Sequence, residues 1–230
     1  MFTASGEYPI LPLPAVLFPG TFLPLQITED EHRRLLRDYN DENQLLGVIL
    51  NPGQHGRSGQ AVPCTVGCTA SIALVLDQDD AKAMNVVLYG EQRMRVGAFT
   101  KQDPYYTAQI DLLEESLGEH AERRSKEASK LFQHYLELIR RRYGAHMVNL
   151  PLPDDPILAS YLLATVLYLP LETKQHWLES SSVAVRLQEE LAFLHAECEK
   201  IALLLALSHR TQHHYVLPDT DLFSSLFSQN

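Results

Sequence analysis

The first hydrophobic stretch of the chain, Tyr8 to Ile27, is interrupted by prolines at close intervals: Pro9, Pro12, Pro14, Pro19 and Pro24. Proline removes a backbone donor and fixes φ, so the stretch cannot form a helix and is expected to be extended, with edge-strand or bulged pairing. Phe18, Pro19 and Gly20 have the composition of a turn. Because the stretch is strongly apolar, we expect it to be buried as the seam of a small β-barrel, closed by later strands.

A short amphipathic helix is predicted directly after this stretch. Thr28 and Glu31 have the spacing of a capping box. The apolar face of the helix would carry His32, Leu35, Leu36 and Tyr39. The opposite face has three arginines, at 33, 34 and 37, which we interpret as a solvated surface because acidic residues surround them.

Further strands are predicted up to about residue 115. The run at 45–50 has the pattern of a buried strand, and the glycine-rich segment 51–60 reads as a loop. Apolar and alternating segments follow from Val62, separated by turn residues at 77–80 and 103–104. Consecutive strands with tight connections favour an antiparallel meander that closes on the first stretch.

Helical periodicity replaces the strand pattern in the second half. We predict helices over 119–143, ending at Gly144, over 156–168, which is apolar nearly all round, and around 172–178. Serines 180–182 would cap a last long helix. Its apolar residues step by four and three: Val183, Leu187, Leu191, Leu194, Cys198, Ile201 and Leu205. Such a narrow seam predicts near-antiparallel, coiled-coil packing against another helix.

These patterns predict an α+β protein with a β-barrel over 1–116, a helical subdomain over 117–207 and a tail over 208–230. The tail carries four apolar residues, Leu222, Phe223, Leu226 and Phe227. They could dock on the body of the same chain or bind a partner as a short linear motif, and the pattern leaves both open.

Composition narrows the class of partner. The 230 residues carry a formal net charge of −10, and acidic residues outnumber basic ones in both halves, which argues against nucleic acid. Three cysteines are too few for a disulfide framework and favour a reducing compartment. No secretory leader or membrane-spanning apolar run is evident, so we expect a cytoplasmic protein. The sequence does not indicate the oligomeric state.

Residues 11–27, LPLPAVLFPGTFLPLQI, look like the opening signature of the Lon protease amino-terminal domain family, also called the Lon substrate-binding domain. Residues 66–72, with Cys68 where threonine is commoner, and 88–96, which include Gly90, Arg93 and Arg95, are similar to two of its strands. Lys174-Gln175 and Arg186-Leu187 resemble pairs in its helical half.

This resemblance implies an antiparallel β-barrel of the pseudouridine-synthase-and-archaeosine-transglycosylase-like (PUA-like) kind, followed by an α-helical bundle. It also implies a module that binds protein substrates and catalyses nothing. The expected partners are unfolded or flexible polypeptide segments, with a protease or a chaperone as a further partner if the chain acts as an adaptor.

No chemistry is evident from motifs. The chain contains no Gly-Lys pair, so it has no Walker A loop, and it lacks the peptidase block of Lon proteases. Cys64 and Cys68 would lie about 13 Å apart on an extended strand, too far for one tetrahedral metal ion. His195 and Glu199 share a helix face beside Cys198, whose position in the apolar seam favours a structural role. We therefore expect no cofactor and no metal.

Four aromatic residues are candidates for a binding surface: Phe18, Phe22, Tyr105 and Tyr106. The first two flank the predicted turn, and of two adjacent tyrosines on a strand one must face away from the core. All four could instead be ordinary core or rim packing. Two rival functions stay open: binding of RNA or a modified nucleotide, which requires a basic cleft, and an uncharacterised hydrolase, which requires a buried carboxylate or histidine with a perturbed pKa in a pocket.

Overall fold

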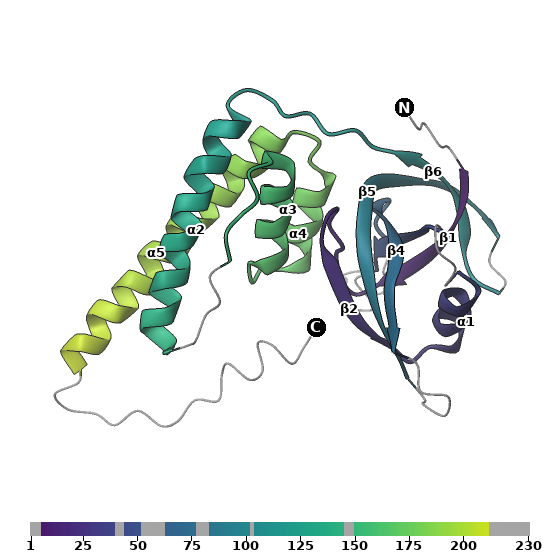
Figure 1. The fold of residues 1–230 in the computed structure, drawn as a ribbon, viewed down its shortest axis with the longest axis horizontal. Helices are drawn as coiled ribbons and strands as arrows, with labels where there is room; N and C mark the ends of the chain where they lie inside the picture. Colours follow the sequence, from purple (N-terminus) through teal and green to yellow (C-terminus); the bar gives the residue numbers. More distant parts are fainter. Residues whose placement is uncertain are drawn as a thin grey trace.

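The computed structural model describes residues 6–39, 44–51, 63–76, 83–101, 104–144 and 150–211. The strands form one body and the helices after residue 120 form another beside it (Figure 1), which confirms the α+β class. The strands are β1 (Gly6–Leu13), β2 (Phe22–Ile27), β3 (Leu46–Leu50), β4 (Val66–Leu76), β5 (Met84–Lys101) and β6 (Thr107–Leu112). The helices are α1 (Asp30–Asp38), α2 (Ala121–Tyr143), α3 (Pro156–Val166), α4 (Leu171–Glu179) and α5 (Val183–Thr211).

Five of the strands close into a barrel in the order β1-β3-β4-β5-β6, and β6 returns to β1. The long strand β5 makes this possible because it pairs with β2 over residues 84–89, with β6 over residues 94–101, and with β4 over residues 85–95. All pairings among the described strands are antiparallel except β1–β3, which is parallel. The prediction of an antiparallel barrel is wrong for the β1–β3 pairing alone, because the chain crosses over through β2 and α1 before it enters β3.

The first strand is not an edge strand, although its prolines predicted edge or bulged pairing. Its first half pairs with β6 and its second half, Ile10–Leu13, pairs with β3. The Ile10 N–H donates to the Tyr106 carbonyl at 2.8 Å, so the nitrogen of Pro9 points to the opposite side, where β3 has not yet begun to pair. The nitrogen of Pro12 points toward β6 beyond the end of that pairing. Both prolines therefore cost the sheet no hydrogen bond.

The predicted turn at Phe18 is present and is pinned to β5. Gly20 adopts a left-handed conformation with φ of +73°, and the Thr21 hydroxyl donates to the Phe18 carbonyl at 2.8 Å. The Gly20 N–H donates to the Gly90 carbonyl at 2.8 Å, and the Gly90 N–H donates to the Thr21 carbonyl at 2.9 Å. A Cβ at position 90 would lie 2.2 Å from the Phe18 carbonyl oxygen, so only glycine fits there.

The helix α1 covers part of the barrel, but the capping box predicted for it is wrong. The helix begins at Asp30, so Glu29 is the N-cap and its side chain makes no capping hydrogen bond. Thr28 lies one residue too early to cap. The apolar face is as expected, since Leu35 and Leu36 are fully buried.

The two long helices α2 and α5 pack side by side through the predicted apolar seam, but they run parallel to each other (Figure 1). An isolated parallel bridge between Ser116 and Ser182 places both helix starts together. Further along, Leu138 of α2 packs with Cys198 and Ile201 of α5. The predicted antiparallel packing is therefore wrong, because α3 and α4 bring the chain back to the start of α2 before α5 begins.

The ends of these helices follow the sequence signals. Gly144 adopts a left-handed conformation after α2, with φ of +65°. The Ser182 hydroxyl accepts from the Val185 N–H at 3.4 Å at the start of α5. Helix α3 is less central than its apolar sequence suggested, since Leu158 and Val166 are exposed.

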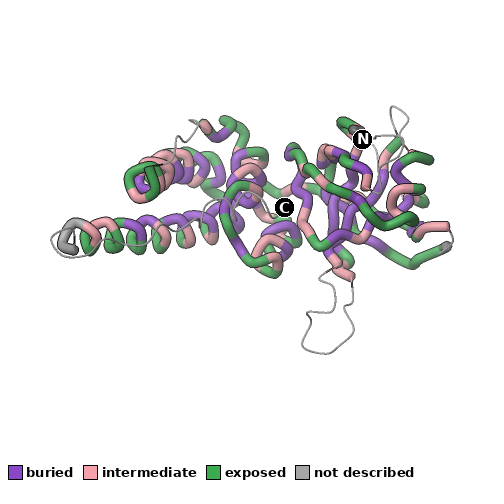
Figure 2. The backbone as a smooth tube through the Cα atoms, turned by 90° about the horizontal axis from the view of Figure 1, so that it is seen from below, coloured by how far each residue is buried: buried purple, intermediate pink, exposed green. Residues whose placement is uncertain are grey.

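Buried residues lie in both parts of the molecule (Figure 2). One core cluster joins Phe18 and Val66 to the helices, and the barrel interior forms separate clusters. Phe18 is 1% exposed and packs among helical residues, with its ring centroid 5.8 Å from that of Tyr161. No helix in the part of the chain that the structure describes is long and apolar enough to span a membrane. Nearly all of the predicted loop 51–60 and the apolar tail residues Leu222–Phe227 lie outside the described residues.

Candidate functional site: a polar joint and an apolar surface

Buried charged side chains lie where the barrel meets the helices. Arg93 of β5 and Arg186 of α5 are 1% and 0% exposed, and both form ion pairs with Glu115, which lies between β6 and α2. The Tyr161 hydroxyl donates to Glu115 Oε1 at 2.6 Å, and the Arg186 guanidinium lies over the Tyr161 ring at 4.1 Å. We call Arg93, Glu115, Tyr161 and Arg186 the polar joint.

The polar joint is tied to the backbone as well as to itself. Arg93 donates to the carbonyls of Glu114 and Leu178, at 2.9 Å and 3.1 Å. Arg186 donates to the Ser180 carbonyl at 3.0 Å. Each guanidinium thus connects elements that are far apart in sequence, and its geometry fixes how the helices sit on the barrel.

A fully buried carboxylate adjoins the joint. Glu190 is fully buried; the Ser160 hydroxyl donates to its Oε1 at 2.7 Å, and Arg186 Nε donates to the Ser160 hydroxyl at 2.6 Å. The other carboxylate oxygen of Glu190 has no hydrogen-bond partner among the described residues. Burial raises the pKa of Glu190 to about 8, against the lowering effects of the Ser160 hydrogen bond and the Arg186 charge.

Three residues of the motifs that carried the resemblance have structural roles here. Arg93 and Arg186 form the joint, and Gln175 of α4 donates to the Val66 carbonyl of β4 at 3.0 Å. Glu115, Tyr161 and Glu190 were not predicted. A charged residue inside a helical seam, as at Arg186 and Glu190, is the signal that could have identified the last of them.

An apolar surface lies on the outside of the barrel beside the joint. The residues of β2 that face outward are Phe22, Pro24 and Gln26, and they pair in register with Tyr89, Val87 and Asn85 of β5. Phe22 is 60% exposed and contacts the Tyr89 ring at a centroid distance of 5.0 Å. Leu74 of β4, which pairs with Val87, is 48% exposed.

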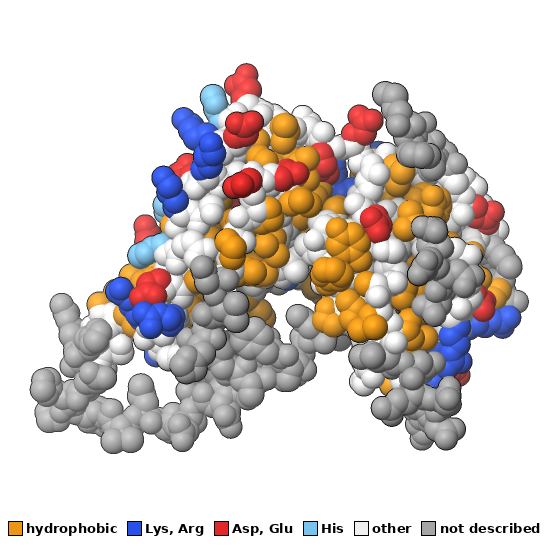
Figure 3. Space-filling view, in the orientation of Figure 1, with side chains coloured by type: hydrophobic (Ala, Val, Ile, Leu, Met, Phe, Trp, Pro, Cys, Tyr) orange, Lys and Arg blue, Asp and Glu red, His pale blue; other side chains and the backbone are white. Residues whose placement is uncertain are grey.

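Helix α3 continues this surface. Leu158, Leu162 and Val166 lie at four-residue steps on one face of α3, and none of them is buried. The Leu158 side chain reaches the turn before β2, since a Cβ on Gly20 would lie 2.6 Å from its Cδ2. We call the set Phe22, Pro24, Leu74, Val87, Tyr89, Leu158, Leu162 and Val166 the apolar surface. Hydrophobic side chains gather on both sides of an inward step between helices and barrel (Figure 3).

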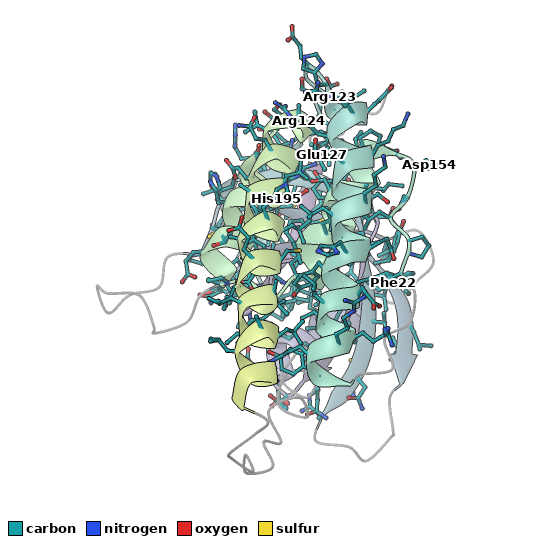
Figure 4. All side chains as sticks on the ribbon, turned by 90° about the vertical axis from the view of Figure 1, so that its left-hand side faces the viewer. Phe22, Arg123, Arg124, Glu127, Asp154 and His195 are labelled. Carbon is teal, nitrogen blue, oxygen red and sulfur yellow. The ribbon has the colours of Figure 1, made fainter. Side chains whose placement is uncertain are left out.

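Acidic side chains border this surface. Asp154 and Asp155 precede α3, and Asp155 accepts from the Ile157 N–H at 2.8 Å as the helix N-cap. Phe22 and Asp154 lie on the same side of the molecule (Figure 4). Acidic side chains lie around the central hydrophobic side chains, whereas the lysines and arginines gather mainly toward the two ends of this face (Figure 3).

The structure does not bring the four predicted binding residues together. Phe18 is buried in the shared core, and Phe22 is exposed in the apolar surface. Tyr105 packs edge-on against Tyr39 at 5.9 Å, and Tyr106, partly exposed, packs against Phe99 at 5.8 Å. The two tyrosines precede β6, at the end of the barrel away from the helices (Figure 1). The other residues of the apolar surface were missed, although the alternation of β2 and the four-residue steps of α3 carry the signal.

The described residues form no evident centre for metal or acid–base chemistry. Among the residues described, no group of three or more His, Cys, Asp or Glu is placed to hold a metal ion. Burial raises the pKa of the Cys64 thiol and of the Cys68 thiol, so neither is activated as a nucleophile. Glu190 has the perturbed pKa that a hydrolase would need, but its side chain is fully buried and has no surface for a substrate.

The class that these features define is an α+β protein in which a closed barrel packs against a helical part and an apolar surface lies at their boundary. The sequence matches the ATP-dependent protease La (LON) substrate-binding domain over residues 7–196. The chain belongs to this family.

Individual relatives agree with this assignment. The chain is 27% identical over 194 residues to the Lon protease of Azospirillum brasilense, an alignment that covers 83% of this chain and 24% of the relative. The chain therefore spans about a quarter of that relative's length.

Solved structures show the same fold. The amino-terminal domain of the Mycobacterium avium complex Lon protease matches with a TM-score of 0.62 at 18% identity, covering 83% of this chain and 98% of that one. A Lon N-terminal domain protein from Xanthomonas campestris matches with a TM-score of 0.57 at 20% identity, covering 81% and 98%.

Proposed function

We propose that the chain binds unfolded or flexible polypeptide segments through the apolar surface and catalyses no reaction. The observation that carries this proposal is the exposure of Phe22, a large aromatic side chain that is 60% exposed. The chain also belongs to a substrate-binding domain family. An exposed aromatic residue flanked by further apolar side chains is typical of a protein-binding surface. An unfolded segment offers apolar side chains that a folded protein keeps inside.

The charges around the surface support a preference among clients. With a net charge of −10 and acidic side chains at the border, the surface attracts segments that carry lysine or arginine near their apolar residues. The same charge disfavours RNA, which we regard as the alternative ligand. The free cysteines fit a reducing compartment, and we place the protein in the cytoplasm.

The remaining predicted features take supporting roles in this proposal. We assign the barrel to 1–116, the helical subdomain to 117–207 and the tail to 208–230. Phe18 supports the surface from within, because it anchors the turn that precedes Phe22. Tyr105 and Tyr106 would form a separate minor contact. Presentation of clients to a protease or chaperone, as an adaptor, would use the helical subdomain or the tail.

The test is a comparison of ligands and variants. The purified protein is titrated with a reduced, unfolded polypeptide, with the native form of the same polypeptide and with a structured RNA, and affinity is measured by fluorescence anisotropy. We expect binding of the unfolded polypeptide alone. Phe22→Ser with Leu158→Ser should weaken it at least tenfold, because two exposed apolar contacts are lost. Phe99→Ser is the matched control, since it removes an exposed aromatic residue elsewhere on the barrel.

Three results would contradict the proposal. Equal affinity for native and unfolded polypeptide would remove the selectivity for unfolded chains. An equal loss of affinity in Phe99→Ser and in the double variant would show that the apolar surface is not the binding site. Tight, salt-sensitive binding to RNA alone would favour the alternative ligand.

A further inference from the structure

Strand β2 has one neighbour among the strands that the structure describes. It pairs with β5, and no other described strand lies along its second edge. In Figure 1 this strand is on the side of the barrel nearest the helices, and Figure 3 shows the surface stepping inward in that region. An open edge of this kind carries backbone donors and acceptors that another extended chain can pair with.

The register of β2 identifies the groups on its open edge. The Gly90 N–H donates to the Thr21 carbonyl, so in this ladder Leu23, Leu25 and Ile27 are the residues that exchange hydrogen bonds with β5. The side-chain contacts agree, because Phe22 stacks on Tyr89 and the Gln26 side chain donates to Asn85 at 3.4 Å, as expected of the closer, non-hydrogen-bonded pairs. The backbone groups of Phe22, Pro24 and Gln26 therefore point away from β5.

We propose that an extended, basic and apolar polypeptide segment adds to this open edge as an antiparallel strand, with its apolar side chains on the apolar surface. The proposal rests on the function proposed above and specifies how the client is held. Phe22 and Gln26 each supply one N–H and one carbonyl, and Pro24 supplies a carbonyl alone. These groups recognise any backbone, which suits a site that must accept many sequences.

The side chains and charges indicate what kind of segment fits. In an antiparallel ladder, directly opposite residues project to the same face. Client residues that bond to Phe22 and Gln26 therefore place their side chains on the outward face, next to Phe22, Pro24 and Leu158. Asp154 lies on the same side of the molecule as Phe22 (Figure 4), so this acidic border favours a client that carries lysine or arginine beyond the apolar residues of the outward face. Proline in the client is disfavoured because it lacks the N–H.

The test uses an eight-residue peptide of alternating valine and lysine and two N-methylated versions of it, one methylated at every valine nitrogen and one at every lysine nitrogen. If the valines lie on the outward face, their N–H groups face β2. We expect methylation of the valines to weaken binding at least tenfold, measured by calorimetry, and methylation of the lysines to change it less than threefold. The reverse pattern would support strand addition in the parallel direction.

A matched pair of protein variants tests the same edge from the other side. Gln26→Pro removes one outward N–H, as Pro24 already does, without removing a bond to β5. Gln26→Ala keeps the N–H and removes the side chain. We expect Gln26→Pro to bind the unmethylated peptide about fivefold more weakly than Gln26→Ala does, the effect of one net hydrogen bond. Urea unfolding of both variants checks that the fold is retained.

Each failure has a separate meaning. If both methylated peptides bind as well as the parent, and Phe22→Ser weakens all three, the strand is not added and the apolar surface alone holds the client. If none of the peptides nor an unfolded polypeptide binds, the proposed function fails as well. If the protein forms a dimer in sedimentation experiments that Gln26→Pro dissociates, the open edge belongs to a second copy of this chain, and the proposal is wrong.

Discussion

The polar joint and the apolar surface depart in opposite directions from the usual arrangement of side chains. The joint buries two arginines against a partly buried carboxylate between barrel and helices, and the surface leaves Phe22, Leu74 and Leu158 in water. The two regions are neighbours, because the turn that buries Phe18 also begins the strand that exposes Phe22. Directional bonds in the joint fix how the helices sit on the barrel, and non-directional apolar contacts leave the surface tolerant of different partners.

The largest effect on stability should come from removing the carboxylate of Glu115, which the two arginines of the polar joint share. Glu115→Ala leaves Arg93 and Arg186 buried without their counter-ion and removes the acceptor of the Tyr161 hydroxyl. We expect it to lower the free energy of unfolding by about 3–5 kcal/mol, the usual cost of breaking a buried ion pair. Urea unfolding followed by circular dichroism measures the change.

The matched control is a carboxylate with two arginine partners on the surface. Glu137 pairs with Arg140 and Arg141 on α2, which hold its pKa at about 2, but the group is exposed to solvent. Glu137→Ala should leave the free energy of unfolding almost unchanged, because solvent screens an exposed ion pair. Similar losses in the two variants would mean that burial does not distinguish the joint.

The next effect concerns the contact that links the two regions. Gly90→Ala places a Cβ against the Phe18 carbonyl oxygen, which forces the turn off β5. We expect a loss of about 1–3 kcal/mol in unfolding free energy, as for other overpacked sites. Gly97→Ala on the same strand is the control, since its Cβ would lie 3.3 Å from the nearest atom. Equal stability of the two variants would show that the turn is not held by this contact.

Glu190 makes the stability of the joint depend on pH. Its pKa is raised to about 8 in the folded protein and is about 4.3 in an unfolded chain. Below pH 4 the carboxyl is protonated in both states, and the contribution to stability is complete. Between these pKa values the unfolded state releases the proton first, so each pH unit lowers the unfolding free energy by about 1.4 kcal/mol.

Glu190→Gln isolates this contribution, since the amide cannot ionise. Urea unfolding of the wild type and of Glu190→Gln at pH 5, 6, 7 and 8 should give a difference that shifts steadily in favour of the variant as the pH rises. Parallel pH profiles would show that the carboxyl of Glu190 ionises in the folded state much as it does in the unfolded chain.

How far the sequence predicts this molecule depends on how local each determinant is. The helix ends at Gly144 and Ser182 and the turn at Gly20 were predicted, because each depends on the backbone of a few neighbouring residues. The predicted antiparallel packing of α5 against α2 was wrong. An apolar seam is the same in both directions, and the Ser116–Ser182 bridge is what shows that the two helices are parallel. The polar joint was missed because Arg93, Glu115 and Arg186 meet only in the folded chain.

The candidate site shows the same limit. Phe18 and Phe22 were chosen as a pair because they flank one turn, yet burial separates them: one is 1% exposed and the other 60%. Strand alternation predicts that the even-numbered residues 22, 24 and 26 share a face, but not which face is outside. The outward face of β2 is determined by the interior of the barrel, because Leu23 and Leu25 pack there against a core built from distant strands.

Phe22→Ser should have the smallest effect on stability, and it gives the sharpest test of the difference between the polar joint and the apolar surface. Phe22→Ser removes a side chain that is mainly in water and whose ring contacts that of Tyr89, itself part of the apolar surface. We expect a change of less than about 1 kcal/mol in unfolding free energy, because little buried area is lost. The same variant should lose affinity for an unfolded polypeptide. A large loss of stability would instead mean that Phe22 belongs to the core, and the division between a joint that holds the fold and a surface that binds clients would not stand.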